Sequence, residues 1–123
     1  MMCIKAIRNL SSDELNCLNE MIDISDIEEY DIIIYEKNDL EIIGSIAISQ
    51  KKDNKLTYIN HHYVKESHRN SGIGKKLLEM AAKLTPFPLF VCISIEEDLV
   101  PYYEKHKFKV VNQDNQIIMV QQK

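Results

Sequence analysis

The residues of this sequence that are best suited to chemistry lie in the stretch from Leu56 to Leu84. A β-prone run over Leu56–Val64 leads through a short polar loop into Ser71-Gly72-Ile73-Gly74, and an apolar pattern of helical spacing follows. A strand, a glycine turn and a helix start present unpaired backbone N–H groups and a positive helix end to an anion. The stretch therefore predicts an anion-binding site; the plain alternative is a strand-to-helix turn without a ligand.

The elements that must position this stretch alternate between strands and helices. Predicted strands cover residues 3–7, 32–37, 41–50, 56–64, 89–95, 108–111 and 117–121, and predicted helices cover 12–22, 73–84 and 99–106. Ser11 and Glu14 have the spacing of a capping box, and Asp98 is expected to cap the last helix. The apolar run 89–95 is typical of a strand buried on both faces, and Gly44 indicates a bulge or a close backbone approach. This order predicts an α/β fold with a mixed sheet and helices on both faces.

Five acidic side chains cluster between Asp23 and Asp31. The segment is expected to form a short second helix or an ordered loop. Its carboxylates are either a solvated face or a negative wall that attracts an amine-bearing substrate.

Composition narrows the range of functions. A net charge of −4 argues against nucleic-acid binding. No apolar run approaches the length of about 18 residues that a membrane span needs, and the N-terminus lacks the pattern of a signal peptide. Three widely spaced cysteines, Cys3, Cys17 and Cys92, favour reduced thiols over a disulfide framework or a metal site. We therefore expect a single cytoplasmic domain, residues 1–123, with no nucleic-acid, membrane or metal partner.

Two motifs carry a family resemblance. Arg69-Asn70-Ser71-Gly72-Ile73-Gly74 matches the signature Gln/Arg-x-x-Gly-x-Gly/Ala, and the strand 89–95 is followed by Tyr102-Tyr103-Glu104-Lys105-His106-Lys107-Phe108. With the element order, these motifs make nearly the whole chain resemble the GNAT superfamily of N-acetyltransferases. Lys107 stands where that family usually has glycine, and Glu96 where it often has asparagine. The chain is also short between its first helix and second strand, where the family shapes its acceptor pocket.

The resemblance implies a GNAT-like sheet of six or seven strands that splays between the fourth and fifth strands. It implies acetyl-CoA as the cosubstrate and no metal. The glycine turn would hold the pyrophosphate, and the end of the strand 56–64 would pair with the pantetheine arm. The expected cofactor-binding residues are Tyr63, Val64, Arg69, Asn70, Ser71, Gly72, Ile73, Gly74, Lys75 and Lys76.

The reaction implied by the resemblance is direct attack of a primary amine on the thioester in a ternary complex, with Tyr103 as general acid. Tyr102 is the register alternative. Strand alternation places Tyr58, Asn60, His62 and Val64 on one face. His62 is therefore the candidate base, or His61 if a bulge shifts the alternation. Glu66 and His68 in the loop are weaker options, expected to be solvated, and a structural histidine pair and a water base remain open.

Other residues and functions complete these expectations. Cys92 is expected to pack in the core, and His106 to lie on the surface. The acceptor is expected to be a small cationic amine or a polypeptide amine, and the protein a monomer or homodimer. The competing function is a catalytically degenerate acyl-CoA-binding module with a sensing or partner-binding role.

Overall fold

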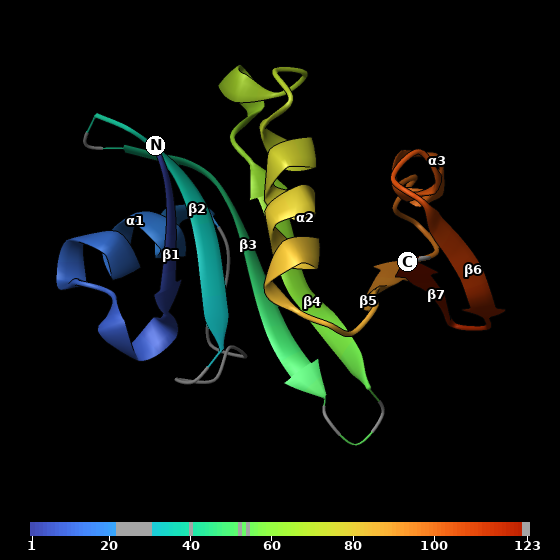
Figure 1. The fold of residues 1–123 in the computed structure, drawn as a ribbon. Helices are drawn as coiled ribbons and strands as arrows, with labels where there is room; N and C mark the ends of the chain where they lie inside the picture. The colour runs from blue at the N-terminus through green and yellow to red at the C-terminus, as the bar shows by residue number, and fades with distance from the viewer. Residues whose placement is uncertain (22–30, 40, 52, 54, 122–123) are drawn as a thin grey trace.

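The computed structural model describes residues 1–21, 31–39, 41–51, 53 and 55–121. Figure 1 shows one twisted, seven-stranded sheet in the order β1-β2-β3-β4-β5-β7-β6. The strands are β1 (Met2–Ala6), β2 (Ile32–Asn38), β3 (Glu41–Lys51), β4 (Leu56–Val64), β5 (Leu89–Ser94), β6 (Phe108–Gln113) and β7 (Gln116–Gln121). Strands β4 and β5 pair in parallel, and the other neighbours are antiparallel. The sheet is therefore mixed, as predicted.

Helices cover both faces of the sheet. They are α1 (Ser12–Met21), α2 (Ile73–Leu84) and α3 (Val100–Glu104), with short 3-10 turns η1 (Ile7–Asn9) and η2 (Glu66–His68). Side chains of β2 alternate between two clusters: Ile34 packs with the apolar stripe of α2 and with α3, whereas Ile33 and Tyr35 pack with α1. Because neighbouring residues of a strand point to opposite faces, α1 lies opposite α2 and α3. Among the described residues, no helix is long and apolar enough to cross a membrane.

The sheet opens between β4 and β5. Their parallel pairing consists of Thr57 with Leu89 and Tyr58 with Phe90 and continues no further along the described strands. The closed end is fixed by the Thr57 amide, which donates to the Pro88 carbonyl at 2.9 Å, and by a 2.7 Å hydrogen bond between the buried hydroxyls of Thr57 and Thr85. The predicted splay between the fourth and fifth strands is confirmed.

A bulge in β4 changes which side chains share a face. His61 pairs with Ala47 and Ile59 with Ile48, so Asn60 is an extra residue without a partner position on β3. An extra residue reverses the alternation beyond it. The prediction that Tyr58, Asn60 and His62 share a face is therefore wrong.

The bulge determines which of the two neighbouring histidines lies on which face. His62 lies over the face of α2 and α3, as does Ile59, which belongs to the same apolar cluster as the α2 stripe. His61 lies on the face of α1, where its Nε2 is 3.1 Å from the Ser45 hydroxyl. Gly44, expected at a bulge or close approach, has both: β2 and β3 change register beside it, and a Cβ there would lie 3.0 Å from Ile73 Cγ2.

Two local predictions are wrong. Asp98 does not cap the last helix, because α3 begins at Val100 with Leu99 at its N-cap and no side-chain cap, and Pro101 occupies the first turn. Strand β5 is not buried on both faces: burial alternates, and Cys92 is half-buried rather than enclosed in the core.

The acidic segment is only partly described. Its last residue, Asp31, is buried, and its carboxylate accepts a hydrogen bond of 3.2 Å from the Asn60 side chain. Asp31 is therefore not part of a solvent-facing negative wall. The possible second helix and the other acidic residues, 23–30, lie outside the described residues.

Lys107 has a left-handed backbone conformation with φ of 71° at the turn between α3 and β6. A side chain with a Cβ is disfavoured there by about 1 kcal/mol, which explains why glycine is usual at this position in the family the sequence resembles. The departure from the motif therefore adds strain at this turn.

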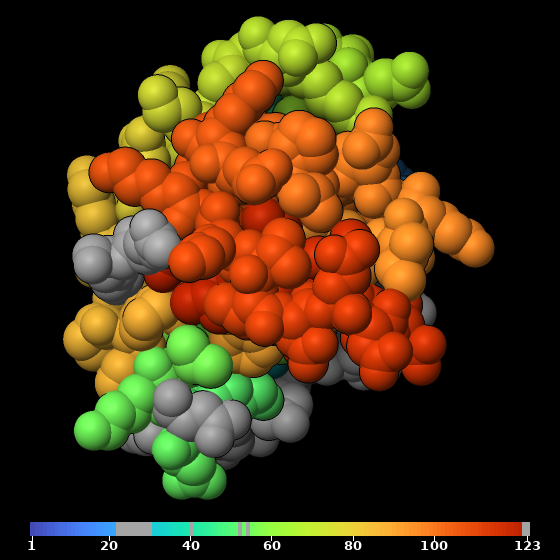
Figure 2. All heavy atoms as spheres, turned by 90° about the vertical axis from the view of Figure 1, so that its right-hand side faces the viewer, coloured from blue at the N-terminus to red at the C-terminus, as the bar shows by residue number. Residues whose placement is uncertain are grey.

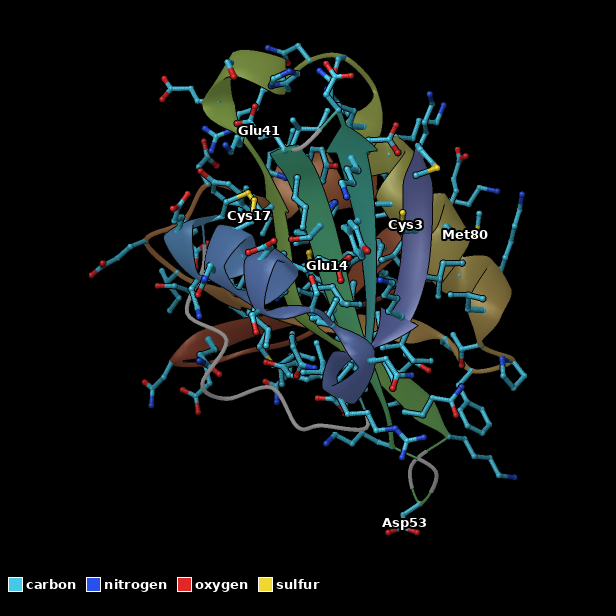
Figure 3. The ribbon with its side chains drawn as sticks, turned by 90° about the vertical axis from the view of Figure 1, so that its left-hand side faces the viewer. Cys3, Glu14, Cys17, Glu41, Asp53 and Met80 are labelled. Carbon is cyan, nitrogen blue, oxygen red and sulfur yellow. The ribbon has the colours of Figure 1, made fainter. Side chains whose placement is uncertain are left out.

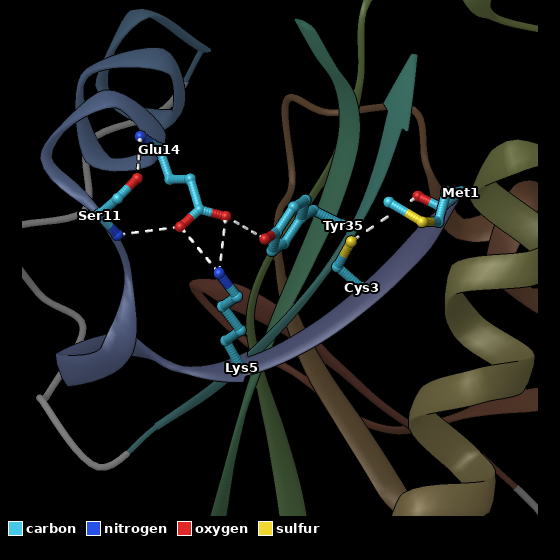
Figure 4. Close-up of polar contacts among 6 residues, drawn as sticks. All are labelled: Met1, Cys3, Lys5, Ser11, Glu14 and Tyr35. Carbon is cyan, nitrogen blue, oxygen red and sulfur yellow. Dashed lines mark hydrogen bonds and ion pairs between the residues drawn. The ribbon is translucent and has the colours of Figure 1, made fainter. Parts of the chain in front are cut away.

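The N-terminus of α1 is anchored to the sheet through Glu14, as Figures 3 and 4 show. The predicted capping box is present: the Glu14 amide donates to the Ser11 hydroxyl at 3.1 Å, and the Ser11 amide donates to the Glu14 carboxylate at 2.9 Å. Lys5 of β1 and the buried Tyr35 of β2 donate to the same carboxylate. Burial raises the pKa of Glu14, but these hydrogen bonds outweigh it and lower the pKa from 4.5 to about 2.

The ionisation of Glu14 makes the stability of the fold depend on pH. Because its pKa is lowered in the folded protein, its stabilisation is present above pH 4.5 and is lost as the pH falls towards 2. A glutamine at position 14 can still accept the capping-box hydrogen bond from the Ser11 amide, but it has no charge. We expect Glu14→Gln to lower the free energy of unfolding by about 1 to 2 kcal/mol at pH 7. Urea unfolding from pH 7 to pH 2.5 measures this, with the exposed Asp13→Asn as control. A wild-type advantage that persists undiminished at pH 2.5 would contradict the assignment.

Candidate active site

A cavity of about 580 Å³ lies on the face of α2 and α3, at the end of β4, beyond the point where β4 stops pairing with β5. It is lined by His62, Tyr63, Val64, His68, Arg69, Asn70, Gly72, Ile73, Gly74, Lys75, Glu97, Leu99, Tyr102, Tyr103 and His106. In Figure 2, the yellow-green loop that precedes α2 borders the orange residues of α3 at the surface. The cavity is thus built by the end of β4, the start of α2, and α3.

The N-terminus of α2 faces this cavity without a side-chain cap. Gly72 is its N-cap, with φ of 86°, a conformation that residues with a Cβ resist. A Cβ on Gly72 would have no heavy atom within 4 Å, so the turn borders open space. Asn70 also has a positive φ, 65°, which asparagine tolerates better than most residues. The glycine turn therefore holds the first amides of a helix open to an anion.

Gly74 is required by a close approach of α3. A Cβ there would lie 2.7 Å from the Tyr102 hydroxyl and 3.5 Å from His62 Nε2. The second glycine of the motif thus lets the start of α2 pack directly against the side chains of α3 and β4.

His62 and Tyr103 meet at the centre of the cavity wall. His62 Nδ1 lies 3.3 Å from the Tyr103 hydroxyl, and Nε2 lies 3.0 Å from the Gly74 carbonyl oxygen. Burial lowers the pKa of His62 to about 4, although the Gly74 carbonyl opposes this shift. Burial, with smaller effects of Tyr102 and Glu97, raises the pKa of Tyr103, so the phenol keeps its proton at neutral pH.

Two of the expected cofactor-binding residues in the loop before α2 are engaged with other parts of the protein. Arg69 Nε donates to the Val64 carbonyl at 2.9 Å, and the guanidinium lies 5.5 Å from the centre of the Tyr63 ring. The Ser71 hydroxyl donates to the His68 carbonyl. Ser71 and Lys76 do not line the cavity, whereas the other ten expected catalytic and cofactor-binding residues do.

Three further residues line the cavity that the sequence did not single out for it: Glu97, Leu99 and His106. His68, a weaker option for the base, and Tyr102, the register alternative of Tyr103, also line it. His106, expected on the surface, is half-buried, and its ring centre is 4.8 Å from that of Tyr102. The spacing of four residues from Tyr102 to His106 is a signal that the two share one side of a helical turn.

The comparisons with known proteins agree with this geometry. Residues 5–118 match the family model of the acetyltransferase (GNAT) domain. The chain belongs to the GNAT acetyltransferase family. A search of curated proteins by sequence finds no match.

Solved structures with the same fold include other GNAT-type proteins. An acyl-CoA N-acyltransferase from Pseudomonas aeruginosa has a TM-score of 0.82 at 16% identity, with 99% of each chain covered. Escherichia coli ElaA has a TM-score of 0.79 at 17% identity, again with 99% of each chain covered. PaiA N-acetyltransferase from Thermoplasma acidophilum, solved in complex with coenzyme A, has a TM-score of 0.79 at 19% identity, covering 100% of this chain and 99% of that one.

The GNAT assignment makes the chain an acyltransferase that works with acyl-CoA. The site described above fits a coenzyme A thioester, because an uncapped helix N-terminus, a turn with open space at Gly72 and the end of β4, beyond its pairing with β5, line one cavity. In the part of the chain that the structure describes, no cluster of three or more histidine, cysteine or acidic residues has the arrangement of a metal site.

The close packing of Gly74 against Tyr102 can be tested by measuring the free energy of unfolding of variants. Alanine is preferred over glycine in a helix by about 0.5 to 1 kcal/mol, but its Cβ would collide with the Tyr102 hydroxyl. We therefore expect Gly74→Ala to stabilise a Tyr102→Phe background by about 0.5 kcal/mol and to give no gain in the wild-type background. Denaturant unfolding of the four proteins measures the difference; equal effects in both backgrounds would show that the hydroxyl does not constrain position 74.

Proposed function

We propose that residues 1–123 form one acyl-CoA N-acyltransferase domain that transfers an acetyl group from acetyl-CoA to a primary amine, by direct attack in a ternary complex. One observation carries the proposal: Tyr103 and the uncapped N-terminus of α2 line the same cavity, beyond the point where β4 stops pairing with β5. This arrangement supports a general acid and an anion-binding helix end along one path.

The path suits acetyl-CoA from one end to the other. Amides of residues 70–75 bind the pyrophosphate at the start of α2, where Gly72 leaves room, and Lys75 adds positive charge. The pantetheine arm runs along β4 near Tyr63 and Val64, where β4 no longer pairs with β5. Arg69 contributes by holding the end of β4 through the Val64 carbonyl.

Chemistry takes place beside Tyr103. An uncharged amine attacks the thioester carbonyl, a C–N bond forms, and the C–S bond breaks with its electron pair going to sulfur. Tyr103 donates its phenolic proton to that sulfur, and a proton from the amine nitrogen returns to the phenol through water. The raised pKa of Tyr103 keeps the donor form present at neutral pH.

Water is the proposed base that deprotonates the incoming ammonium group. Both ring nitrogens of His62 already have partners, and His61 lies on the opposite face of the sheet against Ser45. Neither histidine has a free nitrogen facing the cavity. We place this reaction in the cytoplasm, in keeping with three free cysteines.

The proposed acceptor is a cationic amine. A second hollow of about 570 Å³ is lined by Glu20, Met21, Tyr63, Lys65, Glu66 and Ser67, and shares Tyr63 with the first cavity. Two carboxylates, Glu20 and Glu66, line this hollow, while the ammonium of Lys65 is paired with Glu41. A positively charged acceptor is attracted there, next to the end of β4.

Gly72 tests the pyrophosphate site. Asparagine and aspartate both tolerate a left-handed conformation and have the same shape, so Gly72→Asn and Gly72→Asp differ mainly in charge. We expect the aspartate variant to bind CoA at least about tenfold more weakly than the asparagine variant, because its carboxylate repels the phosphates. Calorimetry at two salt concentrations measures this, and the ratio should shrink as salt increases. Equal affinities would refute the phosphate assignment.

Tyr103 tests the reaction itself. With acetyl-CoA and a panel of primary amines, we expect Tyr103→Phe to lower kcat on the order of a hundredfold while CoA affinity changes less than about twofold. Thiol release measures turnover, and Tyr58→Phe, outside the cavity, is the control. Tight CoA binding without turnover in the wild type would instead support an acyl-CoA-binding module.

A further inference from the structure

The side chain of His62, which belongs to β4, makes hydrogen bonds with two other elements. Nε2 contacts the Gly74 carbonyl in the first turn of α2, and Nδ1 contacts the Tyr103 hydroxyl of α3. The ring also packs near both tyrosines, with ring centres 6.0 Å from Tyr102 and 6.2 Å from Tyr103. His62 therefore bridges the anion-binding turn and the proposed acid.

The partners determine which nitrogen carries the proton. A carbonyl oxygen only accepts hydrogen bonds, so the contact with Gly74 requires a proton on Nε2. In a neutral imidazole, Nδ1 is then an acceptor, and the Tyr103 hydroxyl is the donor that it contacts. The same arrangement fixes the ring orientation, because both of its nitrogens are engaged.

The surroundings keep this ring neutral. The titratable groups that act on it are Tyr102 and Tyr103 from α3, His106 beyond that helix, and its neighbour His61. The other titratable or charged residues of the same cavity are His68, Arg69, Lys75 and Glu97. Burial lowers the pKa of His62 to about 4, and His106 adds to this effect. His62 is consequently uncharged throughout the neutral range and has no free nitrogen for an amine.

We infer that His62 is a positioning residue: fixed by the Gly74 carbonyl, its Nδ1 holds the Tyr103 hydroxyl at the opening between β4 and β5. This inference rests on the proposed function for its catalytic consequence, but the hydrogen bonds themselves do not. When the thioester sulfur lies in the opening, rotation about the phenolic C–O bond points the hydroxyl proton at sulfur instead of at Nδ1. The oxygen does not move in this rotation. The role differs from the base expected from the sequence.

The first test needs no activity. In the ¹⁵N-labelled protein without ligand, NMR should show His62 protonated at Nε2 and unprotonated at Nδ1, with no titration between pH 5.5 and pH 8. This pH range lies above the His62 pKa of about 4 and below the range in which a phenol ionises. The Tyr103 hydroxyl proton should exchange more slowly than in His62→Ala. A proton on Nδ1, or titration with a midpoint near 6.5, would overturn the inference.

The second test separates positioning from proton transfer. Asparagine places its side-chain oxygen near the position of Nδ1, whereas glutamine places its amide near Nε2 and leaves Tyr103 without an acceptor. We expect His62→Ala and His62→Gln to lower kcat about tenfold and His62→Asn to retain most of it, with KM for acetyl-CoA within about twofold in all three. His61→Gln, on the opposite face, is the matched control and keeps the wild-type kcat.

The double mutant and the pH profile complete the design. In a Tyr103→Phe background, His62→Ala should change kcat less than about twofold, because the group it positions is gone. Independent losses that multiply, or a low-pH limb near pH 6.5 that His62→Ala removes, would make His62 an acid–base group instead. If no amine supports turnover, the proposed function fails, and the NMR result alone decides the inference.

Discussion

The parting of β4 from β5 after Tyr58 is the constraint on which the rest of the structure depends. Hydrogen-bonded strands in the middle of a sheet normally continue together, because an unpaired buried backbone is costly. Here the buried Thr57 and Thr85 hydroxyls and the Pro88 carbonyl hold the closed end. Beyond it, the backbone of β4 is left for another partner. An extended, amide-containing arm such as that of a coenzyme A thioester would satisfy those groups, so the defect in the sheet is also the proposed binding path.

Two backbone irregularities convert that opening into a site. The bulge at Asn60 moves His62 to the face of α2 and α3, and the left-handed Gly72 lets α2 begin at the mouth of the opening. The short helix α3 then brings Tyr103 over His62. Each irregularity has a local cost, and each places a group that a regular strand or helix would direct elsewhere. The proposed chemistry therefore depends more on backbone geometry than on an unusual set of side chains.

Local patterns in the sequence predicted much of this arrangement. The capping box of Ser11 and Glu14, the glycine turn and the order of elements depend on neighbours in sequence, so they could be predicted without a structure. The faces of β4 could not, because the Asn60 bulge is set by pairing with β3. The start of the last helix could not be predicted either: α3 begins at Val100, so Asp98 does not lie at its N-cap. Lys107 adopts a left-handed conformation at the position where the motif usually has glycine, which the type of residue alone would not have predicted.

The central claim is that coenzyme A passes between β4 and β5 and brings its sulfur to Tyr103. A crystal structure of the protein with CoA bound tests it most directly. We expect the pyrophosphate at the amides that follow Asn70, the pantetheine arm along β4 beyond Tyr58, and the sulfur within about 3.5 Å of the Tyr103 hydroxyl. A pantetheine arm that lies outside the opening, with its sulfur beyond hydrogen-bond reach of Tyr103, would contradict it.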